Sequence, residues 1–201
     1  MKSRPSQPSK GMLEPRNGHS GHDAYKHIFR FFGLQENPFN GGPDLRYLSF
    51  TRQIQEAFDA LTYGIQTRQG LMLLTGEAGT GKTTLNSYLL NWLRQRQAPT
   101  SYIFNSLLNA DDLFDYIAAY FGVAPQSKLK DKKSALTAWL LAIHRQGKIP
   151  VLIIDEAQDL PLSVLEEIGL LLNLESSRQK LLQIVLVGQP ELEQKLAHRF
   201  F

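Results

Sequence analysis

One eight-residue stretch limits the folds open to this chain of 201 residues more than any other feature. The pattern G-x-x-x-x-G-K-[ST] is matched at every fixed position by residues 76–83, GEAGTGKT. An apolar run precedes it at Leu71–Thr75, and a helical pattern begins near Lys82. A glycine-rich loop between a strand and a helix directs backbone N–H groups and the helix dipole at an anion. The sequence therefore predicts a phosphate-binding loop, with a glycine-rich turn and a solvated lysine as the competing interpretation.

Two residues of this stretch carry further predictions. Lys82 is expected to reach the β- and γ-phosphates of a bound nucleotide, and the Thr83 hydroxyl to ligate Mg²⁺. The phosphate chain itself is expected to lie against the loop residues, which are Gly76, Glu77, Ala78, Gly79, Thr80, Gly81, Lys82 and Thr83.

A second candidate site is the apolar run Val151–Ile154, which ends in Asp155 and Glu156. Buried strands rarely end in two carboxylates without a reason. After a phosphate loop, the Asp is expected to hold the Mg²⁺ shell and the Glu to polarise the attacking water. Taken alone, the pair is equally typical of an exposed strand end.

Gln189 follows another apolar run, Ile184–Gly188. A polar group at the tip of a strand beside the phosphate loop can hydrogen-bond the γ-phosphate or the attacking water. The pattern predicts a sensor residue here, and a plain Gln-Pro turn fits the spacing equally well.

Short apolar runs alternate with helical patterns along the chain, which predicts an α/β fold with a parallel sheet flanked by helices. The expected strands are 71–75, 101–105, 150–155 and 183–188. Helices are expected over 51–69, 83–97, 111–121, 132–146 and 161–175, with Asp111 as an N-cap. Residues 1–24, rich in Ser, Pro and Gly, are predicted to be a disordered tail, and 25–201 one folded core.

Charge is nearly balanced in the predicted core. The tail holds two of the three net positive charges, leaving 18 basic against 17 acidic residues in the rest of the chain. A lysine cluster at 128–133 is therefore interpreted as a solvated loop more readily than as a phosphate contact. There are no cysteines and no apolar run of about 18 residues that could span a membrane, so a cytoplasmic protein is expected.

Several blocks in this order resemble the AAA+ ATPases typified by general secretion pathway protein A, the ExeA-like ATPases, within a wider group that includes transposition ATPases. The blocks are FFGLQENPF at 31–39, LTGEAGTGKTTL at 74–85, LIIDEAQDL at 152–160 and LQIVLVGQPEL at 182–192. The resemblance implies a P-loop NTPase core of the AAA+ (ASCE) type that binds ATP with residues 76–84, Thr84 included. It further implies Mg²⁺ at Thr83 and Asp155, catalysis by Glu156 assisted by Lys82, sensing by Gln189, and adenine near residues 37–39.

Members of this group continue beyond the block at 182–192 into a fifth strand, an arginine-bearing stretch and a helical lid. This sequence ends at Phe201, so a core lacking the lid is expected; either a catalytic arginine comes from elsewhere, or the chain is a truncated product. An arginine finger contributes about 10³–10⁵ in rate, which predicts slow turnover without it.

Three functions follow as hypotheses. The first is a Mg²⁺-dependent ATPase that self-associates and serves envelope secretion with a partner protein. The second is an ATP switch for a DNA-bound filament of the transposition type, which the balanced charge of the core does not favour. The third is a catalytically silent ATP-binding module.

Overall fold

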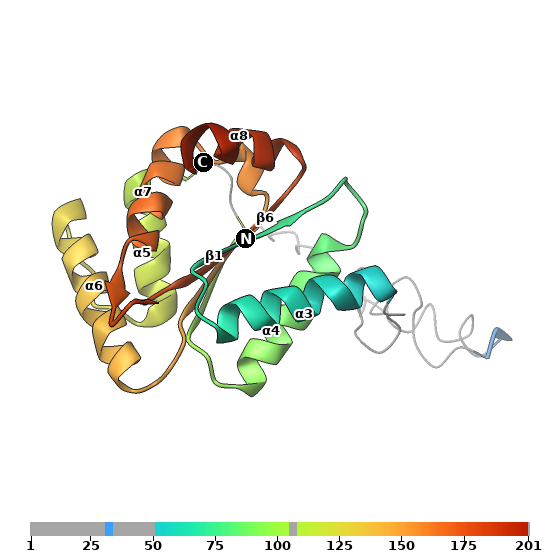
Figure 1. Ribbon diagram of the computed structural model, residues 1–201, viewed down its shortest axis with the longest axis horizontal. Helices are drawn as coiled ribbons and strands as arrows, with labels where there is room; N and C mark the ends of the chain where they lie inside the picture. Colours follow the sequence, from blue (N-terminus) through green and yellow to red (C-terminus); the bar gives the residue numbers. More distant parts are fainter. Residues whose placement is uncertain (1–30, 34–50, 105–107, 201) are drawn as a thin grey trace, which may run out of the picture. The chain divides into compact units, whose positions relative to one another are not determined.

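The computed structural model describes residues 31–33, 51–104 and 108–200 (Figure 1). The chain divides into two compact units, Met1–Gly42 and Pro43–Phe201. All the elements described below belong to the second unit. The predicted tail at 1–24 and the segment at 37–39 lie outside the described residues.

Helices and strands alternate along the second unit. The helices are α3 (Arg52–Gln66), α4 (Lys82–Gln95), α5 (Ala110–Phe121), α6 (Leu129–Arg145), α7 (Leu162–Leu172) and α8 (Glu191–Phe200), with a short 3-10 turn, η1, at Ala157–Asp159. The strands are β1 (Leu71–Thr75), β2 (Thr100–Ile103), β3 (Val151–Ile154), β4 (Glu175–Ser176), β5 (Gln179–Lys180) and β6 (Gln183–Gly188). Among the described helices, none is long and apolar enough to cross a membrane.

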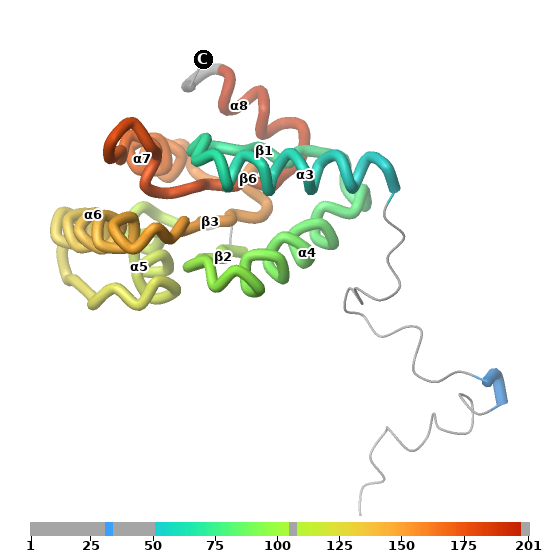
Figure 2. The backbone as a smooth tube through the Cα atoms, turned by 60° about the horizontal axis from the view of Figure 1, so that its bottom comes forward, coloured from blue at the N-terminus to red at the C-terminus, as the bar shows by residue number. Residues whose placement is uncertain are grey.

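Four strands form one parallel sheet in the order β1-β6-β3-β2 (Figure 2). The register pairs Leu71 with Ile184, and Val151 with both Gln183 and Thr100. Because all four strands run the same way, the loops that leave their carboxyl ends gather at one edge of the sheet. That edge carries the phosphate loop after β1, Asp155 after β3 and Gln189 after β6.

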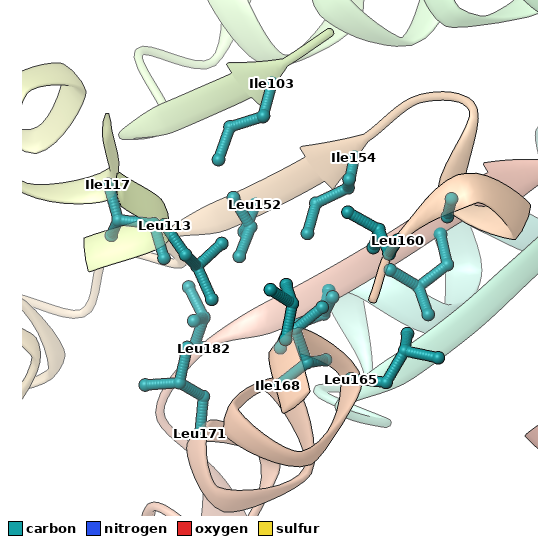
Figure 3. Close-up of a cluster of buried hydrophobic side chains, with 14 of the residues drawn as sticks. Ile103, Leu113, Ile117, Leu152, Ile154, Leu160, Leu165, Ile168, Leu171 and Leu182 are labelled. Atoms are coloured by element: carbon teal, nitrogen blue, oxygen red, sulfur yellow. The ribbon is translucent and has the colours of Figure 1, made fainter. Parts of the chain in front are cut away.

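The two central strands are buried on both faces, as continuous apolar runs in parallel sheets usually are. In β3, Val151 and Ile153 join the core beneath α3 and α4. Leu152 and Ile154 point to the other face and pack in the core formed with α5, α6, α7 and α8 (Figure 3). The two cores fix β3 on both sides, and with it the position of Asp155 at the strand's end.

The predicted strands and helices are confirmed, several of them with shifted ends, whereas α8 and the β4-β5 hairpin were not predicted. β1 and β6 have the predicted bounds, whereas α6 begins three residues earlier than predicted and α7 ends three residues earlier. Glu175, predicted as the last residue of this helix, instead begins the β4-β5 hairpin, with Ser177 and Arg178 in the left-handed region at its turn.

The predicted N-cap of α5 was wrong. Asn109 caps the helix: its side-chain oxygen accepts a hydrogen bond from the Asp112 backbone N–H at 3.0 Å, and its own N–H donates to the Asp112 carboxylate at 3.4 Å. This reciprocal pair satisfies two donors at once. Asp111 lies in the first turn, where its carboxylate pairs with Lys132.

Candidate nucleotide site

The loop between β1 and α4 has the geometry of an anion cradle. Gly81 stands at the N-cap of α4 with φ of 92°, a left-handed conformation that favours glycine. The Thr80 hydroxyl donates to the Glu77 carbonyl at 2.8 Å, and the Gly76 N–H donates to the Gly188 carbonyl at 3.2 Å. The first contact closes the loop, and the second ties it to β6. The amino end of α4 is thereby left facing the loop, where its dipole favours negative charge.

The ammonium group of Lys82 lies inside this loop. It donates to the Gly76 carbonyl at 2.6 Å and to the Glu77 carbonyl at 2.8 Å. Two neutral carbonyls do not cancel a full positive charge. A phosphate group that enters the loop therefore meets an ammonium already held in place.

Residues from three separate segments line one cavity of about 350 Å³ beside the loop. Its lining consists of Ala78, Gly79, Gly81, Lys82, Thr83, Thr84, Glu156 and Gln189. The fold therefore brings Glu156 and Gln189 to the phosphate loop, as the sequence predicts. Three of the predicted loop residues, Gly76, Glu77 and Thr80, shape the loop without lining the cavity.

Asp155 is not among the residues that line the cavity, and it is only 2% exposed. One carboxylate oxygen accepts the Glu156 backbone N–H at 3.0 Å. The other accepts the Tyr102 hydroxyl at 2.8 Å and the Asn86 amide at 3.1 Å. Three donors suit an ionised carboxylate, because a buried charge is stable only where it is hydrogen-bonded.

The residues predicted to bind Mg²⁺, together with Asn86, supply the hard oxygen atoms that this ion prefers. Thr83 lines the cavity, and the buried Asp155 directly precedes Glu156, which lines it too. The Asn86 side-chain oxygen is buried with no hydrogen-bond partner in the described part of the chain, so it has a free acceptor. Mg²⁺ takes few protein ligands and keeps several waters, so this donor set fits it. No group of three or more His, Asp and Glu side chains able to hold a metal occurs within the described residues.

Tyr102 and Asn86 were not predicted as site residues. Tyr102 lies on β2, next to β3 in the sheet, and burial together with its hydrogen bond to Asp155 raises the pKa of its phenol. The phenol therefore stays protonated and donates. Asn86 is 1% exposed on a helix face shared with Leu85 and Leu89. A polar residue on that apolar face was the signal available in the sequence.

Replacing Tyr102 by Phe tests the support of Asp155. The substitution removes one hydroxyl and leaves a buried carboxylate with two donors instead of three. We expect the free energy of unfolding to fall by about 1–3 kcal/mol, measured by urea denaturation with tryptophan fluorescence. Tyr120→Phe, at a side chain 56% exposed, serves as the matched control and should stay within about 0.5 kcal/mol of wild type. Equal losses in the two variants would contradict the assignment.

Gln158 joins Glu156 to the end of β6 and was also not predicted. Its amide nitrogen donates to the Glu156 carboxylate at 2.8 Å, and its amide oxygen accepts the Gln189 backbone N–H at 3.1 Å. Glu156 itself has φ of 51°, a conformation that non-glycine residues adopt at a cost of about 1–3 kcal/mol. The Glu156 side chain is therefore held through a bridge from the Gln189 backbone.

Gly188 permits this bridge. A Cβ atom at this position would lie 2.6 Å from the Gln158 side-chain oxygen and 3.3 Å from the Gln158 backbone nitrogen. The Lys195 ammonium on α8 donates to the carbonyls of Gln158 and Leu160 at 2.9 and 2.5 Å. The turn after β3 is thus fixed from both β6 and α8.

A parallel β1-β6-β3-β2 sheet with helices on both faces, and a phosphate loop after its first strand, defines a P-loop ATPase domain of the AAA type. The AAA domain family model matches residues 64–196, which is most of the described unit. The chain belongs to this family, and the predicted fold class is confirmed.

Among curated proteins, the chain is similar to General secretion pathway protein A of Aeromonas hydrophila, with 44% identity over 170 residues. The alignment covers 83% of this chain and 31% of that protein, so the chain spans about a third of its relative's length. The resemblance stated from the sequence blocks is thereby confirmed.

Solved structures share the fold at low sequence identity. Cdc6p from Pyrobaculum aerophilum matches with a TM-score of 0.59 and 20% identity, over 76% of this chain and 42% of that one. The Aeropyrum pernix ORC2 protein, in its ADPNP-ADP complexes, matches with a TM-score of 0.53 and 15% identity, over 78% and 47% of the two chains. At these identities the likeness concerns the fold alone.

Proposed function

We propose that this domain binds ATP with Mg²⁺ and hydrolyses it. The observation that carries the proposal is the cavity of about 350 Å³ shared by the phosphate loop, Glu156 and Gln189. A phosphate cradle, a carboxylate and a polar strand tip in one cavity are the parts that hydrolysis of a phosphoanhydride needs.

Binding rests on the loop and on Lys82. Backbone N–H groups and the amino end of α4 receive the phosphate chain, and the Lys82 ammonium exchanges its carbonyl partners for phosphate oxygens. Thr83 and Asp155 would hold the metal, with the Asn86 oxygen available to a metal-bound water. Bound Mg²⁺ supplies positive charge that offsets the charge of the phosphates.

The hydrolytic step rests on Glu156. Its carboxylate takes the proton of the attacking water, the water oxygen bonds to the γ-phosphorus, and the β-γ bridging bond breaks to release ADP and phosphate. In the present conformation the carboxylate is engaged by Gln158. Because Gln158 also accepts from the Gln189 backbone, a γ-phosphate that displaces Gln189 would loosen the same bridge and free Glu156.

A biological role in secretion is proposed from the relative's name and its 44% identity. In this role the domain would act in the cytoplasm, where ATP is supplied, would self-associate as AAA ATPases commonly do, and would pass the energy of hydrolysis to an envelope secretion partner.

The test of nucleotide binding is a titration with fluorescent N-methylanthraniloyl-ATP. We expect saturable binding with Mg²⁺, competed by unlabelled ATP, and affinity weaker by about tenfold or more when EDTA removes the metal. A chain that shows no saturable binding under either condition would contradict the proposal.

A further inference from the structure

The edge of the sheet opposite the nucleotide site carries a concentration of positive charge. We define the basic edge as residues 67–70, 94–99, 144–150 and 175–182, the segments that lead into the four parallel strands. These segments hold Arg68, Arg94, Arg96, Arg145, Lys148, Arg178 and Lys180, and a single carboxylate, Glu175. The nearly neutral total for the core therefore conceals a strong local excess of cations.

Most of these cations are without a carboxylate partner. Lys180 pairs with Glu175, and the other six form no ion pair with any carboxylate in the described part of the chain. In α6, by contrast, two lysines are paired with carboxylates: Lys132 with Asp111 and Asp115, and Lys133 with Glu167. The lysine cluster at 128–133 thus lies largely in α6 and is half paired, while the basic edge is not.

Helix dipoles explain only part of this concentration. Arg94 and Arg145 lie at the carboxyl ends of α4 and α6, where a cation is stabilised by the negative end of the dipole. Lys148 follows the end of α6, and Arg178 lies in the turn of the β4-β5 hairpin. Neither of these two cations lies in the last turn of a helix, so stabilisation by a helix dipole does not account for them.

A pocket of about 260 Å³ lies where the basic edge meets the carboxyl ends of α3 and α4. It is bounded by Gln66, Trp92, Arg96, Gln146 and Lys148, among others, and no carboxylate lines it. The Arg96 guanidinium stacks over the Trp92 ring, 4.0 Å from its centroid, which fixes a charge that would otherwise be mobile. Arg68 donates to the Lys148 carbonyl at 3.0 Å, and its other terminal nitrogen is buried without a partner in the described chain.

We propose that the basic edge binds the phosphate backbone of nucleic acid. Five of its seven cations are arginines, whose planar guanidinium matches phosphate oxygens in pairs. Glutamines between them add the neutral donors that often contact phosphates; they are Gln69, Gln95, Gln97, Gln146 and Gln179. Contacts of this kind position a protein on nucleic acid without reading its sequence.

The composition of the edge favours nucleic acid over an anionic membrane. None of the large hydrophobic side chains exposed in the described chain belongs to the basic edge. Interfacial membrane binding combines cations with apolar side chains that enter the acyl boundary, and the edge offers only the cations. Because the nucleotide site lies at the other edge of the sheet, both sites can be occupied together.

The test is the salt dependence of binding to a fluorescein-labelled DNA duplex, followed by anisotropy with the full chain. Wild type should bind, with log affinity falling linearly as log salt rises. Arg96→Gln combined with Lys148→Gln should make the slope of log affinity against log salt shallower by about 1.8, because each lost phosphate contact contributes about 0.9 to that slope. At about 50 mM NaCl the affinity should fall by about 10- to 100-fold.

A matched control removes the same charge elsewhere. Lys128→Gln combined with Lys130→Gln, at two exposed lysines without carboxylate partners in the described chain, should leave the affinity within about twofold. If Arg96→Gln with Lys148→Gln fails to fold, judged by circular dichroism, Arg94→Gln with Arg178→Gln replaces it.

Three results would overturn the proposal: no binding to the duplex at about 50 mM NaCl, an equal effect of the control pair, or binding to vesicles of phosphatidylglycerol without binding to DNA. The last result would assign the edge to a membrane surface instead.

Discussion

Glu156→Gln is expected to keep nucleotide affinity and to lower the rate of ATP hydrolysis by about 10²–10⁴-fold. An amide fills the space of the carboxylate and retains its hydrogen-bonding oxygen, but it cannot take a proton from water. Glu156 is the carboxylate that lines the cavity beside the phosphate loop. Binding is measured with N-methylanthraniloyl-ATP, and hydrolysis by phosphate release.

Glu191→Gln is the matched control for this variant. Glu191 is an exposed carboxylate in the first turn of α8, at the same edge of the sheet, and it does not line the cavity. Its replacement should leave the rate of phosphate release unchanged. If Glu156→Gln hydrolyses ATP as fast as wild type, Glu156 is not the base and the assignment fails.

Lys82→Ala is expected to weaken ATP binding by about 10- to 100-fold or more. The ammonium provides charge-assisted hydrogen bonds to the phosphates, each contributing about 1.5–3 kcal/mol, and alanine provides none. The measurement is the same nucleotide titration. Lys128→Ala, at an exposed lysine away from the cavity, removes an equal charge and should bind ATP as wild type does.

The Lys82 side chain also bonds two carbonyls of its own loop, so the shape of the loop needs a separate check. Circular dichroism and thermal melting show whether Lys82→Ala remains folded. A folded Lys82→Ala variant with wild-type affinity for ATP would place nucleotide binding elsewhere on the molecule.

The residues at the cavity and the phosphate loop can be predicted from the sequence, because each belongs to a local pattern. The loop at 76–83 needs glycines at fixed places, and β3 and β6 are apolar runs whose ends the chain marks with Asp155 and Gln189. Parallel strand order then brings these ends together. No long-range information is needed beyond the rule that functional loops gather at the carboxyl ends of parallel strands.

The residues that support Asp155 and Glu156 could not be predicted in this way, because their roles depend on contacts between residues distant in the chain. Tyr102 reaches Asp155 across two neighbouring strands, and Asn86 reaches it from α4. The Tyr102 contact has no periodic signature, since it depends on which strand lies next to β3. Asn86 stands out as a polar residue on an apolar helix face, but that pattern does not say which residue it contacts. Gln158 illustrates the same point, because its role depends on the close approach that Gly188 allows.

The net charge of the core can also be read from the sequence, whereas the distribution of the charges depends on the fold. The sequence total predicts a nearly neutral core, and the fold separates the charges that produce this total. Arg68, Arg96 and Lys148 come from three separate segments, yet Arg96 and Lys148 line one pocket and Arg68 bonds to Lys148. Only the strand order reveals that these cations share an edge.

Phosphate release from Mg²⁺-ATP, followed under single-turnover conditions at several chain concentrations, is the most direct test of the central claim. We predict release that requires Mg²⁺, with a rate constant that rises as chains self-associate. Single-turnover conditions detect even slow hydrolysis, because every bound ATP is followed to completion. ATP that stays intact on a saturated, folded chain at every concentration would contradict the claim that this domain is a hydrolase.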